Sequence, residues 1–184
     1  MGILDFFRRK KDKQTSHVDK SIESIRKKQK LLDLYSEIEQ NKYINDEKAK
    51  QLYENAYKET ADNLIERHFY YNKVIDYFYG LRNKDKNALE KCIQYCKEDI
   101  EIAPKVLKLM SKDRTFMHYN EEGKLEFIPP RFPSFQRLAI IYENQGKYEE
   151  AIKICELALK LNLKDGTKTG FKGRIKRLQK KINK

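Results

Sequence analysis

Residues 132–165 have the sequence FPSFQRLAIIYENQGKYEEAIKICELALKLNLKD, which carries the clearest structural pattern in the chain. Its apolar residues recur every three or four positions on both sides of Gly146, which predicts two amphipathic helices joined by a turn. Glycine readily adopts the left-handed conformation that ends a helix, so Gly146 marks that turn. Small residues would let the two helices approach closely while large ones fill the space beside them; they are Ala139, Ala151 and Ala158, and Phe135, Leu138 and Tyr142. We therefore expect an antiparallel helical hairpin.

The stretch is 34 residues long, which is the period of the tetratricopeptide repeat. It resembles that family at the positions Phe135, Leu138, Ala139, Tyr142, Gly146, Tyr148, Ala151, Cys155 and Ala158. Two positions depart from the family pattern, because Leu163 stands where a proline often ends the second helix and Cys155 replaces an aromatic residue. We expect looser packing against the following helix as a result.

The resemblance implies that the first helix of the repeat lines a groove that binds a polypeptide. The residues that it places on this surface are Gln136, Arg137, Ile140, Glu143 and Asn144. Some members of the family clamp a C-terminal carboxylate with paired Lys, Asn and Arg. Only Arg137 fits that clamp, since Pro133 and Val74 stand where its lysine and asparagine belong, so we do not expect a binder of chaperone tails.

The residues after Gly166 predict a one-sided basic helix with apolar positions at Phe171, Ile175, Leu178 and Ile182. It resembles the capping helix that ends a tetratricopeptide array. The stretches IPPRFPSFQRLAIIYE and DGTKTGFKGR also resemble small tetratricopeptide-like proteins of low-GC bacteria and their phages.

The region before the repeat also predicts helices, because no proline occurs before Pro104. We expect one helix over 19–40, a second region over 46–80 that breaks near Asn63 or Asn72, and another helix over 86–102. Pro104 marks the boundary of this last helix, and residues 105–110 are open to a short continuation. Residues 112–133 predict a loop with a small hairpin around Gly123.

A second, degenerate repeat is predicted in the same region by a constant offset from the first. The positions Ile75, Tyr79, Ala88, Cys92 and Tyr95 correspond to Leu138, Tyr142, Ala151, Cys155 and Ala158. Since one repeat cannot bury its own apolar face, these neighbouring helices must supply its partners.

Composition supports the same fold class. The 184 residues include 17 Leu and 17 Ile but only 3 Val and 5 Thr, which excludes an all-β fold and favours an all-α chain of antiparallel hairpins with a capping helix. We expect four regions: a basic arm at 1–17, helices and a loop at 18–131, the repeat at 132–165 and the capping helix at 166–184.

Chemically reactive side chains are scattered along the chain. The three histidines form no metal-binding or catalytic pattern, and there is no phosphate-binding loop or glycine-flanked serine. The three cysteines are expected to be reduced, and Cys92 and Cys96 to be core residues. We therefore expect no enzyme, metal, cofactor or small-molecule substrate, and a cytoplasmic location.

The charge is concentrated at the two ends. The net charge is +12, and residues 31–159 hold 20 basic and 23 acidic side chains, so the excess lies in residues 1–30 and 160–184. The basic ends leave a second function open, namely nucleic-acid binding through contacts to phosphate. The leading hypothesis is a non-catalytic module that binds a polypeptide partner.

The first residues raise one further alternative. Ile3, Leu4, Phe6 and Phe7 precede a basic run at 8–13, an order typical of a short anchor on anionic membranes. We favour a terminus whose phenylalanines pack on the body and whose residues 8–17 are mobile or loosely helical.

Overall fold

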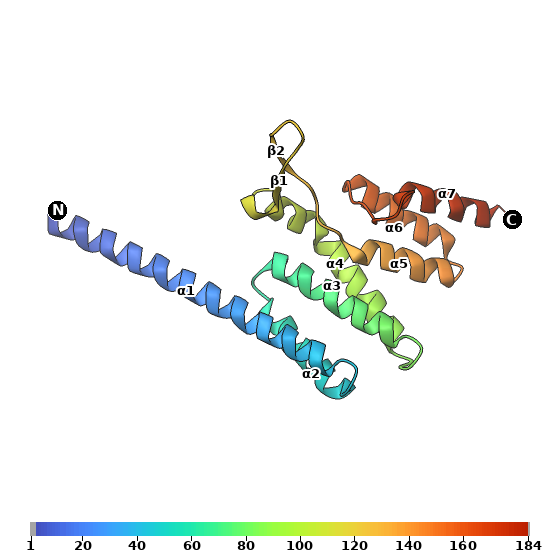
Figure 1. The fold of residues 1–184 in the computed structure, drawn as a ribbon, viewed down its shortest axis with the longest axis horizontal. Coiled ribbons are helices and arrows are strands. Elements are labelled where there is room, and N and C mark those ends of the chain that lie inside the picture. The colour runs from blue at the N-terminus through green and yellow to red at the C-terminus, as the bar shows by residue number, and fades with distance from the viewer. Residues whose placement is uncertain (1–2, 184) are drawn as a thin grey trace. The chain divides into compact units, whose positions relative to one another are not determined.

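The computed structural model describes residues 3–183, and it describes side chains from residue 21 onward. It divides into two compact units, residues 1–59 and 60–184. Helices make up 72% of the chain, and the strands that the structure describes form one two-stranded sheet (Figure 1). The all-α class predicted from the sequence is confirmed.

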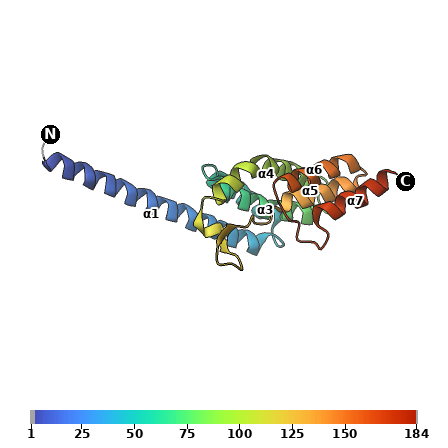
Figure 2. The ribbon, with the colours of Figure 1, turned by 90° about the horizontal axis from the view of Figure 1, so that it is seen from above.

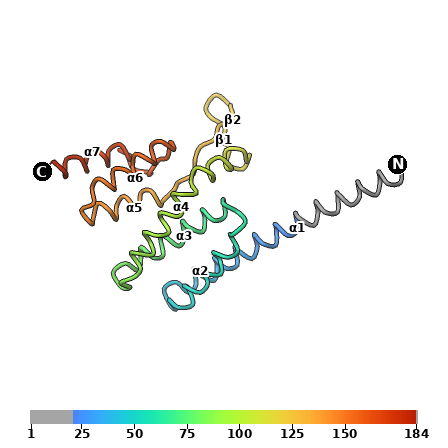
Figure 3. Tube along the Cα trace, turned by 180° about the vertical axis from the view of Figure 1, so that it is seen from behind, coloured from blue at the N-terminus to red at the C-terminus, as the bar shows by residue number. Residues whose placement is uncertain are grey.

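The first unit is a hairpin of two helices, α1 (Ile3–Asn41) and α2 (Asp46–Glu59) (Figure 3). The end of α1 packs against α2. The buried apolar side chains of the hairpin are Leu31, Tyr35 and Ile38 on α1, and Ala49, Leu52, Tyr53 and Ala56 on α2. The expected stop near Asn41 is confirmed, because α1 ends at this residue.

The expected start of this helix near Asp19 is wrong, because α1 begins at Ile3. Residues 3–18 contain no proline or glycine, and they include three Lys, two Arg and one Gln, which favour a helix. The side chains of the apolar patch at residues 3–7 lie outside those described, so the membrane-anchor alternative stays a prediction.

The second unit begins with the hairpin of α3 (Leu64–Leu81) and α4 (Ala88–Met110). Asn63 caps α3, since its side-chain oxygen accepts hydrogen bonds from the backbone N–H groups of Ile65 (3.0 Å) and Glu66 (3.2 Å). This cap confirms one of the two predicted breaks in the region 46–80.

Pro104 does not end the helix, because α4 continues through it to Met110 as a single helix, so the alternative of a continuation over 105–110 is confirmed. A proline inside a helix costs about 3 kcal/mol, since it removes one hydrogen bond and crowds the preceding turn. Burial outweighs that cost here: Ala103, Val106 and Met110 are fully buried on the same side of the helix.

The loop after α4 contains a short 3₁₀ turn, Arg114–Phe116, and two antiparallel strands, β1 (Met117–Tyr119) and β2 (Leu125–Phe127). Met117 pairs with Phe127, and Gly123 has the positive φ of +72° that the connection requires. The predicted hairpin around Gly123 is confirmed.

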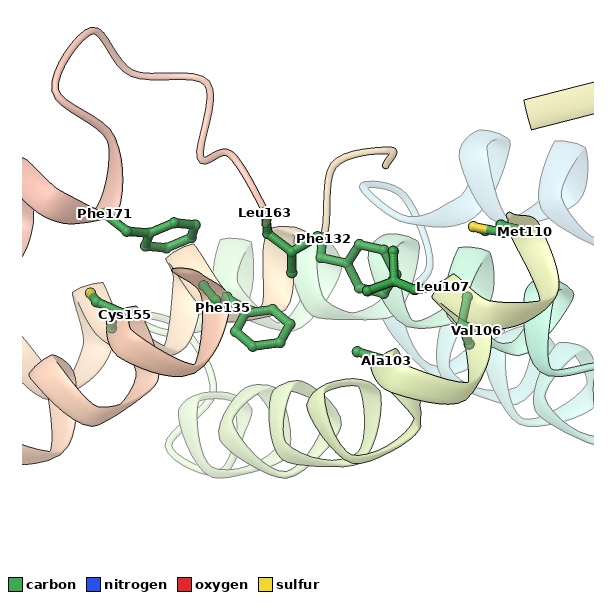
Figure 4. Close-up of a cluster of buried hydrophobic side chains, with 11 residues drawn as sticks. Ala103, Val106, Leu107, Met110, Phe132, Phe135, Cys155, Leu163 and Phe171 are labelled. Atoms are coloured by element: carbon green, nitrogen blue, oxygen red, sulfur yellow. The ribbon is translucent and has the colours of Figure 1, made fainter. Parts of the chain in front are cut away.

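The chain ends in three helices, α5 (Pro133–Asn144), α6 (Tyr148–Lys160) and α7 (Gly170–Ile182). The helices predicted for the repeat and the capping segment are thus confirmed. Figure 2 shows α5, α6 and α7 lying beside one another. Their contacts extend back to the end of α4 through one cluster of buried side chains: Ala103, Val106, Leu107, Met110, Phe132, Phe135, Ala139, Cys155, Ala158, Leu163 and Phe171 (Figure 4).

The offset that predicts a degenerate repeat matches most of its positions in burial, but Tyr95 is half-buried where Ala158 is fully buried. Ile75 and Leu138 are both buried, as are Ala88 and Ala151, and Cys92 and Cys155. These three pairs agree with the predicted second repeat, which stays a prediction, since α4 has 23 residues and α6 has 13.

Candidate functional site

The predicted site lies on α5, whose boundaries follow from local sequence. Pro133 occupies the first turn, where a missing N–H costs nothing. At the other end Gly146 has a φ of +74°. The N–H of Lys147 then bonds to the carbonyl of Tyr142 (2.9 Å) and that of Gly146 to Glu143 (3.1 Å), which is the Schellman arrangement. These contacts fix the end of the helix and the start of α6.

Arg137 joins α5 to α3. Its Nη2 donates a hydrogen bond to Asp76 Oδ1 at 2.9 Å, and its guanidinium lies 3.9 Å from the centre of the Tyr79 ring. Both contacts are favourable for a cation, one to a carboxylate and one to an aromatic face. One side of α5 therefore faces α3.

Glu143 joins α5 to α7. Its carboxylate accepts hydrogen bonds from Arg174 Nη1 at 2.9 Å and Lys181 Nζ at 2.8 Å. Burial acts to raise the pKa of the Glu143 carboxyl, but the hydrogen bond and charge of Lys181 and the charge of Arg174 outweigh it, so the pKa is lowered. Glu143 is thus a carboxylate at neutral pH.

The remaining three predicted residues form a strip on the outward side of α5. Gln136, Ile140 and Asn144 follow one another at spacings of four, which places them along one face of the helix. Gln136 and Ile140 are half-buried and Asn144 is exposed. Gln136 accepts a hydrogen bond from Arg131 at 3.0 Å. This outward strip lies between the Arg137 contact with α3 and the Glu143 contact with α7.

The five predicted residues are therefore divided by the structure into two kinds. Arg137 and Glu143 are engaged within the chain, where they hold α3, α5 and α7 beside one another. Of the five predicted residues, only the three in the outward strip take no part in these ion pairs.

A buried polar cluster connects three helices and was not predicted. Asp99 on α4 contacts His68 Nδ1 on α3 (2.8 Å) through one oxygen and accepts from the Ser134 hydroxyl on α5 (2.5 Å) through the other. All three residues are fully buried, and the His68 ring stacks on Phe132 at 3.9 Å. The sequence does contain one sign of this cluster. Asp99 lies on the apolar side of its helix, three residues after Cys96, where a charged residue needs a buried partner.

This cluster does not form a nucleophile. In a Ser–His–Asp triad the serine bonds to the histidine, which removes its proton. Here Ser134 bonds to Asp99 instead, and burial separates all three side chains from any substrate in water. The cluster can stabilise the packing of α3, α4 and α5, because every buried polar group requires a partner.

The cysteines are equally enclosed. Cys92, Cys96 and Cys155 are free and buried, and burial raises the pKa of the Cys155 thiol to about 11. Within residues whose side chains are described, no group of three or more His, Cys, Asp or Glu could hold a metal ion. Over the same part of the chain, no helix has the length and apolar character needed to cross a membrane.

The hairpin of α5 and α6, which carries the candidate site, matches a known family model. The family model of the tetratricopeptide repeat matches residues 133–165, which are α5, α6 and the turn that follows. Comparisons with curated proteins and with solved structures gave no match. The tetratricopeptide-like character predicted from the sequence is confirmed. Such repeats are in general non-catalytic modules for protein–protein interaction, and the chain carries one.

Proposed function

We propose that the protein binds a polypeptide partner through the outward strip of α5, Gln136, Ile140 and Asn144, without catalysing a reaction on it. The observation that carries the proposal is the position of this strip. Arg137 reaches Asp76 on one side and Glu143 reaches Arg174 on the other, so the strip runs along the middle of a face built from α3, α5 and α7.

Rigid positioning favours binding at this face. The ion pairs of Arg137 and Glu143 hold the neighbouring helices in place before a partner arrives, and preorganisation lowers the entropy cost of association. Ile140 supplies a half-buried apolar contact at the centre, and the amides of Gln136 and Asn144 can bond to a peptide backbone. Arg137 and Glu143 then act mainly as positioning residues.

The experiment compares partners captured by the full chain and by two variants of the strip. Ile140→Asp and Asn144→Arg should each lose a polypeptide that the unaltered chain retains. The exposed residue Lys153 on α6 provides the control, because Lys153→Glu also changes a charge but lies outside the strip. Capture that survives both strip variants would contradict the proposed surface. Co-purification of nucleic acid alone, with strong salt dependence, would contradict polypeptide binding altogether.

A further inference from the structure

The excess charge of the second unit is concentrated in and around α7. Residues 160–184 contain ten Lys or Arg and a single acidic residue, Asp165. Arg174 and Lys181 share the carboxylate of Glu143, which compensates one of their two charges. The other lysines of 160–183 are exposed and make no ion pair or hydrogen bond with any residue whose side chain is described. They are Lys160, Lys164, Lys168, Lys172, Lys176 and Lys180.

Three of these lysines form a regular row. Lys172, Lys176 and Lys180 follow one another at intervals of four residues, so their positions are about 6 Å apart along the helix axis. The opposite side of α7 is buried through Phe171, Arg174 and Leu178. We call Lys172, Lys176 and Lys180 the lysine row.

The lysine row is a site of uncompensated repulsion. Like charges four residues apart destabilise a helix, and α7 offers no acidic side chain beside them. A bound chain of negative charges would remove this repulsion as well as supply attraction. The row is therefore suited to an anionic partner.

We propose that the lysine row of α7 binds an extended, carboxylate-rich segment of another polypeptide. In an extended chain, alternate side chains on one face are about 6.7 Å apart, close to the spacing of the lysines. Asp or Glu at every second position would therefore meet successive ammonium groups.

Nucleic acid fits this surface less well. Single-stranded nucleic acid stacks its bases on aromatic side chains, and the one aromatic residue in 160–184, Phe171, is buried. Arginine forks suit phosphate best, yet Arg174 is buried against Glu143 and Arg177 is directed to Thr169. The exposed row consists of lysine alone.

The test measures binding of a labelled synthetic peptide of about six Glu-Ser repeats to the full chain by fluorescence anisotropy at low salt. The row variant replaces Lys172, Lys176 and Lys180 with glutamine. The matched control replaces three exposed lysines at the end of α4, Lys105, Lys108 and Lys112, and removes the same charge.

We expect the row variant to weaken binding by about tenfold or more and the control by less than about twofold. Equal weakening by both variants would overturn the proposal, as would equal binding of a Gln-Ser peptide or no binding to the unaltered chain. A DNA duplex that displaces the Glu-Ser peptide and depends on the same row would assign the surface to nucleic acid instead. The strip variant Asn144→Arg adds a positive charge outside the row and should not weaken this binding, so the proposed function and this inference fail separately.

Discussion

Substitution of Asp99 tests the buried polar cluster most directly. Asp99 is fully buried and connects two other helices, through His68 on α3 and Ser134 on α5. Asp99→Ala removes the acceptor from both and leaves two buried polar groups without a partner. Asp99→Asn keeps one oxygen acceptor and replaces the other oxygen with an amide that can donate to the Ser134 oxygen.

The expected costs follow from counting those groups. A buried polar group deprived of its partner costs about 1–3 kcal/mol, so the two groups left by Asp99→Ala should together lower the free energy of unfolding by about 2–6 kcal/mol. Asp99→Asn should cost about 1–2 kcal/mol. Ser134→Ala leaves one oxygen of the buried Asp99 carboxylate without its hydrogen-bond donor and should cost about 1–3 kcal/mol.

Urea unfolding followed by far-ultraviolet circular dichroism measures these differences, since the chain has no tryptophan. The exposed Lys153→Ala is the control and should change stability by less than about 0.5 kcal/mol. In the double variant, Ser134→Ala should add little to Asp99→Ala, because the shared bond is already lost. A cost for Asp99→Ala below about 1 kcal/mol, or strict additivity with Ser134→Ala, would refute the reasoning.

Three further predictions concern the repeat. Ala151 is fully buried, so Ala151→Leu should overpack the helix crossing and cost about 1–3 kcal/mol, and a melting temperature equal to that of Lys153→Ala would contradict this. Burial and a raised pKa make the Cys155 thiol unreactive, so a thiol reagent at neutral pH should modify it only after unfolding; rapid labelling of the native protein would argue against the packing. The pKa of Glu143 is lowered from 4.5, so its ion pairs stabilise the fold above that pH and are lost as the pH falls through the lower folded value. Glu143→Gln should therefore cost about 1 kcal/mol at neutral pH and progressively less in acid, and a cost independent of pH would exclude this role.

The sequence predicts the repeat well because its signal is local. Ala151 and Gly146 fix a close helix crossing and a turn within a few residues, and both appear in the structure as expected. Long-range effects were not predictable in the same way. Pro104 is a helix breaker by local rules, and only burial of the following turn explains why α4 continues.

The candidate site shows the same limit. The family pattern places Arg137 and Glu143 on the binding surface, and its spacing rules contain no information on ion pairs with Asp76 or Arg174. Those partners lie far away in the sequence and become neighbours only after the helices pack. His68 is fully buried with Asp99 as the partner of its Nδ1, and no local pattern in the sequence connects these two residues.

The length of α4 affects how the second unit comes apart. Its first half packs in the hairpin with α3, through Cys92 and Cys96, and its last turns belong to the cluster around Phe132. In a repeat array each repeat interacts only with its neighbours. Here α4 contributes side chains to two neighbouring cores, which couples them strongly. Because both cores share α4, unfolding of one should unfold the other. We therefore expect the second unit to unfold in one cooperative step. The least stable point of α4 is Pro104, because proline has no N–H to donate to the carbonyl of Ile100.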